Sequence, residues 1–164
     1  MNIRTAFVSL LAALALAPLA HAQTKISGIV QCAKPDQEFS IPVEGAAGHA
    51  YAISHGKCTW TKPMEIAGSK TKEDVFTNYD EVKGDTAHGH GDGVGTLVSG
   101  DQFRVRLEGK TLLKDGAPLS SEGKWKFVGG TGALKTVKGG GPYTCKGGPE
   151  GMTCEVSGDY SVTK

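Results

Sequence analysis

Apolar and polar residues alternate along several short runs of the chain. Phe103, Val105 and Leu107 alternate with polar residues, which places one set on a buried face of a strand and the other in solvent or a lumen. Similar runs occur at residues 39–43, 50–53, 75–79, 125–127 and 160–162. After residue 22, no stretch keeps the three-four apolar spacing of an amphipathic helix. The pattern therefore predicts an all-β chain.

Glycine-rich turn signals separate these runs. They lie at residues 45–48, 84–85, 91–93, 115–116 and 147–149. The chain has 24 glycines, well above the usual share of about 7%, and glycine and Asx residues adopt positive φ at low cost. Short strands punctuated this often predict a barrel or sandwich of hairpins, and the length favours one domain over residues 23–164.

The amino terminus has the pattern of a secretory signal. Arg4 precedes an apolar run over residues 6–19, and the small-x-small sequence Ala20-His21-Ala22 follows. A membrane anchor is the alternative, but the run is shorter than the ~20 residues that span a bilayer. We predict a signal peptide over residues 1–22 and an exported chain, periplasmic or secreted.

Net charge argues against two classes of partner. Removing residues 1–22 takes away Arg4 and no acid, so the 18 basic residues become 17 and equal the 17 acidic ones. Nucleic-acid binding needs a clustered excess of lysine and arginine, which a neutral chain without basic blocks lacks. We therefore expect no nucleic-acid partner and no anionic membrane surface as partner. We also expect no membrane insertion after the signal is cleaved.

Four cysteines, Cys32, Cys58, Cys145 and Cys154, point to disulfides, because their number is even and the predicted compartment is oxidising. Three pairings are possible. We favour Cys32 with Cys58 and Cys145 with Cys154, since a turn-rich segment lies between the last two. A four-cysteine zinc site is the alternative, but the chain has no Cys-x-x-Cys knuckle.

One segment resembles a known family. Gly129-Gly-Thr-Gly132, followed by Leu134-Lys-x-Val-Lys-Gly-x-Gly-x-Tyr143, is similar to the strand pair near the C-terminus of allene oxide cyclase and dirigent-like barrels. The resemblance covers this one hairpin. It implies an up-and-down antiparallel barrel of about eight strands with a central cavity, and it also implies a homo-oligomer, a trimer. The acidic and aromatic cavity residues of the plant members cannot be aligned, so no catalytic residue is transferred.

The strongest candidate for metal chemistry is the segment containing His88, His90 and Asp92. In an extended strand these three residues share one face, and together they suit zinc or copper. The alternative is a polar hairpin loop, because the intervening glycines give flexibility rather than a held geometry. We expect no resident cofactor unless this segment binds zinc or copper.

A second candidate set contains His49, Tyr51 and His55. His49 and Tyr51 share a strand face and His55 lies beside Gly56, but no carboxylate can be placed near them from sequence. We therefore predict that these residues belong to an ordinary strand surface and turn and do not form an acid–base site. Asp80 and Glu81 are adjacent and so point to opposite faces of a strand, which prevents them from acting as a pair.

Aromatic residues could line a pocket if the barrel is hollow. The candidates are Tyr51, Trp60, Phe103, Trp125, Phe127 and Tyr143. Barrels of about eight strands either fill with side chains or hold one small ligand, so these residues equally suit a packed core.

No nucleophile elbow or catalytic signature is present, and the cysteines are expected to be oxidised. We therefore favour an exported, non-catalytic β-barrel module that binds a small apolar or amphipathic molecule or an envelope protein. The alternatives are a cavity-based isomerase or cyclase acting on an apolar substrate, and a divalent-metal-binding protein.

Overall fold

The computed structural model describes residues 23–163, which form almost only β-strands. The predicted signal peptide, residues 1–22, lies outside this range. The elements are β1 (Thr24–Ala33), β2 (Gln37–Pro42), β3 (His49–Lys62), β4 (Glu65–Ile66), β5 (Ser69–Lys83), β6 (Thr86–Leu97), β7 (Gln102–Lys114), β8 (Ala117–Gly130), the short 3₁₀ helix η1 (Gly132–Leu134), β9 (Lys138–Gly148) and β10 (Gly151–Ser161).

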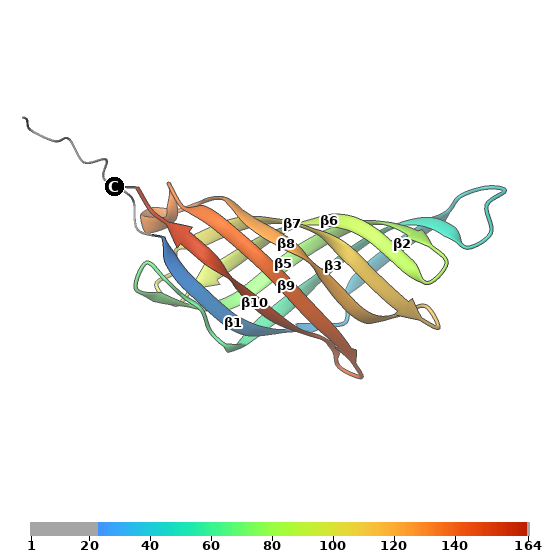
Figure 1. The fold of residues 1–164 in the computed structure, drawn as a ribbon, viewed down its shortest axis with the longest axis horizontal. Coiled ribbons are helices and arrows are strands. Elements are labelled where there is room, and N and C mark those ends of the chain that lie inside the picture. Colours follow the sequence, from blue (N-terminus) through green and yellow to red (C-terminus); the bar gives the residue numbers. More distant parts are fainter. Residues whose placement is uncertain (1–22, 164) are drawn as a thin grey trace, which may run out of the picture.

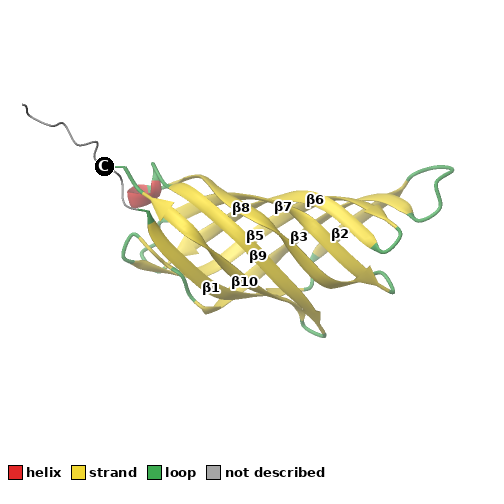
Figure 2. Ribbon diagram, viewed as in Figure 1, coloured by secondary structure: helices red, strands yellow, loops and turns green. Residues whose placement is uncertain are grey.

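The strands close into an eight-stranded antiparallel barrel, as predicted. From β5 to β10 each strand pairs with the next, β10 pairs with β1, β1 with β3, and β3 with β5, which completes the ring. Figure 2 shows the strands tilted around the long axis. Between Thr24 and Val162 no helix is long and apolar enough to cross a membrane.

Strand β2 lies beside the ring rather than within it. β1 pairs with the second half of β3, and β2 pairs with the first half, on the same edge. Residues 34–36 separate the two strands, and Pro35 interrupts any continuous ladder there. The β2–β3 hairpin projects beyond the other hairpins at one end of the molecule (Figure 1).

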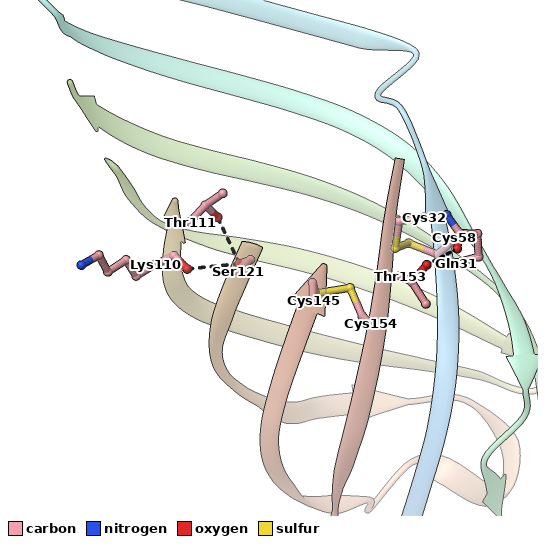
Figure 3. The surroundings of a disulfide bond; sticks show 9 residues. All are labelled: Gln31, Cys32, Cys58, Lys110, Thr111, Ser121, Cys145, Thr153 and Cys154. Atoms are coloured by element: carbon pink, nitrogen blue, oxygen red, sulfur yellow. Dashed lines mark hydrogen bonds between the residues drawn. A yellow bond between two sulfur atoms is a disulfide. The ribbon is translucent and has the colours of Figure 1, made fainter. Parts of the chain in front are cut away.

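Both favoured disulfides are confirmed. Cys32 bonds Cys58 and Cys145 bonds Cys154, and in each pair the two residues are direct cross-strand partners. Figure 3 shows them linking neighbouring strands of one wall of the barrel. The described chain has no free cysteine, so the zinc alternative fails because the four sulfurs are used in covalent bonds.

One predicted turn is wrong. Residues 91–93 lie in the middle of β6 and not between strands, so the hairpin-loop interpretation of the histidine segment is wrong as well. The glycines at 89, 91, 93 and 95 all face the interior, because they alternate with outward residues along one strand. A Cβ on Gly95 would overlap the ring of Phe103, which uses the space that the glycine leaves.

The remaining turns lie at or beside their predicted positions, in the connections β2–β3, β5–β6, β7–β8 and β9–β10. The glycine-flanked hairpin also forms, with β8 and β9 antiparallel and η1 in the connection between them.

The hydrophobic core lies inside the barrel. It contains Ile26, Val30, Trp60, Leu97, Phe103, Trp125, Phe127, Leu134 and both disulfides.

Candidate functional site

Five large apolar side chains lie exposed together on the outside of β2, β3 and β5. They are Phe39 (66% exposed), Ile41 (70%), Tyr51 (55%), Ile53 (47%) and Tyr79 (39%). Phe39 is the direct partner of Ile53, and Ile53 of Tyr79, while Ile41 is the partner of Tyr51. Direct cross-strand partners have Cβ atoms about 5 Å apart, so these side chains form one continuous surface, which we call the outer apolar face.

A charged cluster borders this face. Glu81 Oε1 lies 2.9 Å from His49 Nε2 and 2.9 Å from Lys83 Nζ. The Tyr51 hydroxyl donates to the same oxygen at 3.3 Å. Hydrogen bonds from Lys83 and then His49 lower the pKa of Glu81, and Glu81 raises the pKa of Lys83. The apolar face therefore has a polar rim with both signs of charge.

Glu81 is the carboxylate that sequence reasoning could not place beside His49 and Tyr51. Tyr51 is opposite Glu81 in the β3–β5 register, and that register cannot be read from the chain. His55, the third member of the predicted set, pairs its Nδ1 with the Thr77 hydroxyl at 3.0 Å. These groups lie on the outside of the barrel, away from an interior pocket.

The candidate metal ligands share one outward face, as the spacing predicts. Two of them already have other contacts: Asp92 accepts a hydrogen bond from Arg106 Nε at 3.1 Å, and the His90 ring stacks on Tyr79 with centroids 5.2 Å apart. Within residues 23–163 no three histidine, cysteine or acidic side chains converge as metal ligands. The third candidate, His88, is exposed, so the structure brings the trio to one face without assembling a site.

Four of the six candidate pocket aromatics lie in the core. Trp60, Phe103, Trp125 and Phe127 are 2–8% exposed. Phe127 packs edge-to-face against both Phe103 and Trp125, with centroids 5.6 and 4.9 Å apart. Phe103, Phe127 and Trp125 therefore form one connected aromatic cluster, and Trp60 belongs to the same hydrophobic core.

The other two candidates lie elsewhere. Tyr51 points outward into the outer apolar face. Tyr143 points inward, where its hydroxyl lies over Gly109 and Gly123. Burial raises the pKa of Tyr143. The six residues therefore do not line a common pocket.

The interior also contains carboxylates that the sequence analysis did not select. Burial raises the pKa of Asp74 to about 7. Its Oδ1 and Trp60 Nε1 are both closed to solvent and have no hydrogen-bond partner in the described part of the chain. The indole lies near enough to offset part of the rise in pKa, although the pair falls outside hydrogen-bond geometry. Asp74 as a whole residue is half-buried.

Asp80 is the second interior carboxylate. Burial raises its pKa; His90 opposes the rise and Glu38 adds to it. The alternation of side chains along β5 predicts that both carboxylates point inward. Asp74 and Asp80 are separated by an even number of positions from Phe76, which packs against the core, so all three side chains lie on the same face of the strand. Asp80 points inward while Glu81 points outward, so the prediction that the two cannot pair is confirmed.

A surface groove crosses the outside of β6 to β9. Its floor includes the backbone of Gly89, Gly109 and Gly123, and its walls include Lys110 and Glu122. The lining side chains carry both signs of charge and include few apolar residues, Pro142 and Tyr143 among them, so the groove differs from the mainly hydrophobic and aromatic pockets that hold small ligands. The outer apolar face is the stronger candidate for binding. No family model, curated protein or solved structure matches the chain.

Proposed function

We propose that this chain is an exported, non-catalytic β-barrel module that binds an envelope protein partner through the outer apolar face. Export is supported by the apolar run at residues 6–19 and by the two disulfides. The single observation behind the binding role is the contiguous exposure of Phe39, Ile41, Tyr51, Ile53 and Tyr79. A relationship to allene oxide cyclase and dirigent-like barrels stays a prediction.

The size of the face supports a binding role. A buried aromatic side chain covers about 150–250 Å², so five large residues exposed by 39–70% present on the order of 500 Å² of apolar surface. The largest apolar patch on a typical monomer is about 300–600 Å² and is often functional. Standard protein interfaces bury about 800 Å² on each partner. The outer apolar face and its polar rim together approach this area on one partner.

The shape of the face favours a protein over a small molecule. Small-molecule sites are concave and enclose most of the ligand, whereas this face is the outside of a barrel wall. The interior aromatic rings contact one another directly, which gives an apolar ligand less room than the cavity of a hollow barrel would. A partner protein can cover a broad exposed surface that a small ligand cannot.

Site-specific photo-crosslinking in the native envelope tests the proposal. A photoreactive phenylalanine analogue would replace Ile41, and in a matched strain it would replace Val98, because these residues are equally exposed at 70% and 69%. We expect a discrete protein adduct at position 41 that is absent at position 98. The adduct partner is then purified and its affinity measured against wild type and a Phe39→Ser, Ile41→Ser variant.

The double variant should fold normally, because both side chains are largely exposed, and it should weaken partner binding by at least about tenfold. A Val98→Ser variant should bind as wild type. Equal adducts at positions 41 and 98, or unchanged affinity of the double variant, would refute the proposed function.

A further inference from the structure

Among residues 23–163, strand β2 has a hydrogen-bonding partner on one edge only. It is the terminal strand in the sheet order, and its six residues are all exposed. The Val43 N–H donates to the His49 carbonyl at 2.8 Å. Because backbone bonds alternate along an antiparallel pair, residues 39 and 41 bond to β3, whereas the N–H and C=O groups of Glu38 and Ser40 point to the free edge.

Unpaired edges of this kind are templates for a further strand. Two prolines limit the available length: Pro35 precedes β2 and Pro42 ends it. A segment that pairs with β2 would therefore be short, about four to six residues. Its outward side chains would lie beside Phe39 and Ile41, which extends the outer apolar face by one strand.

The charge around this edge indicates the chemistry of the segment. Within residues 34–44, Asp36, Glu38 and Glu44 are opposed by Lys34 alone, which leaves a net charge of −2. None of these four forms an ion pair among the described residues. Glu38 faces the inner side of the sheet and adds to the raised pKa of Asp80. A cationic side chain of an added segment, placed beside Glu38, would relieve the repulsion between Glu38 and Asp80.

The same charge disfavours a second copy as the occupant. Pairing β2 with β2 of another molecule would bring together two edges that each carry −2, and like charges directly opposite each other destabilise a strand pair. A segment with basic residues has the opposite effect, so charge complementarity selects a heterologous partner.

We infer that the partner presents a short extended segment, apolar on one face and bearing lysine or arginine, which adds to the free edge of β2 as an extra strand. This inference rests on the proposed function and names the partner's chemistry. Main-chain bonds to Glu38 and Ser40 would supply affinity, and contacts with Phe39 and Ile41 would select apolar side chains, as in other cases of strand addition.

A defined peptide tests the inference without knowledge of the natural partner. The probe is a fluorescein-labelled peptide of alternating valine and threonine with lysine at each end, and its affinity for the oxidised protein is measured by fluorescence anisotropy. The matched peptide has glutamate in place of each lysine. We expect the lysine peptide to bind at least about tenfold more tightly, with a difference that shrinks in high salt.

Two protein variants separate backbone pairing from side-chain contact. Ser40→Pro removes an N–H that points to the free edge and leaves the ladder to β3 intact, while Ser40→Ala keeps that N–H. We expect Ser40→Pro to weaken peptide binding by about tenfold, the order expected for one or two lost backbone hydrogen bonds, and Ser40→Ala to bind like wild type. Hydrogen exchange on the wild type gives a check that needs no variant, because the Glu38 and Ser40 amides should become protected when peptide binds.

The outcomes distinguish the two proposals. Loss of binding in the Phe39→Ser, Ile41→Ser variant with full binding by Ser40→Pro would overturn strand addition and leave the proposed function standing. Equal affinity for the lysine and glutamate peptides, or no protection of the two amides, would also overturn the inference. Concentration-dependent dimerisation that Ser40→Pro abolishes would assign the edge to a second copy instead.

Discussion

Replacing Asp74 with asparagine should change how the stability of the barrel depends on pH. Asp74 points into the core from β5, opposite Cys58, and its Oδ1 is closed to solvent without a hydrogen-bond partner in residues 23–163. Burial raises the pKa from its ordinary value of 3.8 to about 7, while Trp60 opposes the rise and Glu73 adds to it. Asparagine has nearly the same shape and does not ionise.

The stability of the barrel depends on pH because the pKa of Asp74 differs between the folded and the unfolded chain. Well below the ordinary pKa of 3.8 the side chain is protonated in both the folded and the unfolded chain, and it costs no ionisation energy. As pH rises toward 7 the unfolded chain ionises while the folded chain stays protonated, so stability falls. The gap between 3.8 and about 7 corresponds to a loss of about 4 kcal/mol, complete above the folded pKa.

The assay is urea unfolding of wild type and Asp74→Asn at a series of values from about pH 4 to about pH 8. We expect the stability of the variant, relative to wild type, to increase by about 4 kcal/mol across that interval. The matched control is Asp85→Asn, the same substitution at an exposed aspartate in the β5–β6 turn, and it should leave the pH dependence of the wild type unchanged. A constant difference between Asp74→Asn and wild type across the interval would refute the argument that the buried carboxyl titrates near neutrality.

Two further predictions concern the covalent and steric supports of the barrel. Replacing both Cys145 and Cys154 with alanine should lower the free energy of unfolding by about 3 kcal/mol, because the bond closes a loop with a sequence separation of 9; an unchanged urea midpoint under non-reducing conditions would contradict this. Gly95→Ala should destabilise the fold by about 1–3 kcal/mol, since its Cβ would overlap the Phe103 ring. Gly148→Ala is the control, with its nearest new contact at 3.8 Å, and equal thermal shifts for the two variants would show that crowding at Gly95 is unimportant.

The sequence predicted the fold where side chains of opposite character alternate. Along β7, Phe103 is buried and its neighbours Gln102 and Arg104 are exposed, as the pattern requires. The predicted turn at residues 91–93 was wrong, because a glycine at every second position is equally typical of a turn and of a strand that has no side chains on one face. Only the rings and side chains of neighbouring strands, such as Phe103 over Gly95, distinguish the two.

The candidate site was harder to predict, because it depends on register between distant strands. Alternation places Phe39 and Ile41 on one face of a strand, but it does not say whether that face is inside or outside the barrel. The aromatic composition of the strands predicts a pocket lined by both Tyr51 and Trp60. The two residues nevertheless lie on opposite faces of β3, because they are an odd number of positions apart on one strand: Tyr51 is exposed opposite Glu81, and Trp60 is buried.

Binding at the outer apolar face depends on two opposing free energies, the gain from covering apolar surface and the cost of association. Covering on the order of 500 Å² of apolar surface gains on the order of 12 kcal/mol, and association costs about 4–15 kcal/mol. The gain and the cost are of the same order, so the affinity depends on the quality of the contacts as well as on the apolar area covered. If a partner strand adds to β2 as inferred, backbone bonds to Glu38 and Ser40, and attraction between the acidic edge and a basic segment, would contribute to which partner binds. Ser40→Pro, which removes one free-edge N–H, should therefore weaken binding of the lysine peptide by about tenfold although it leaves the outer apolar face unchanged.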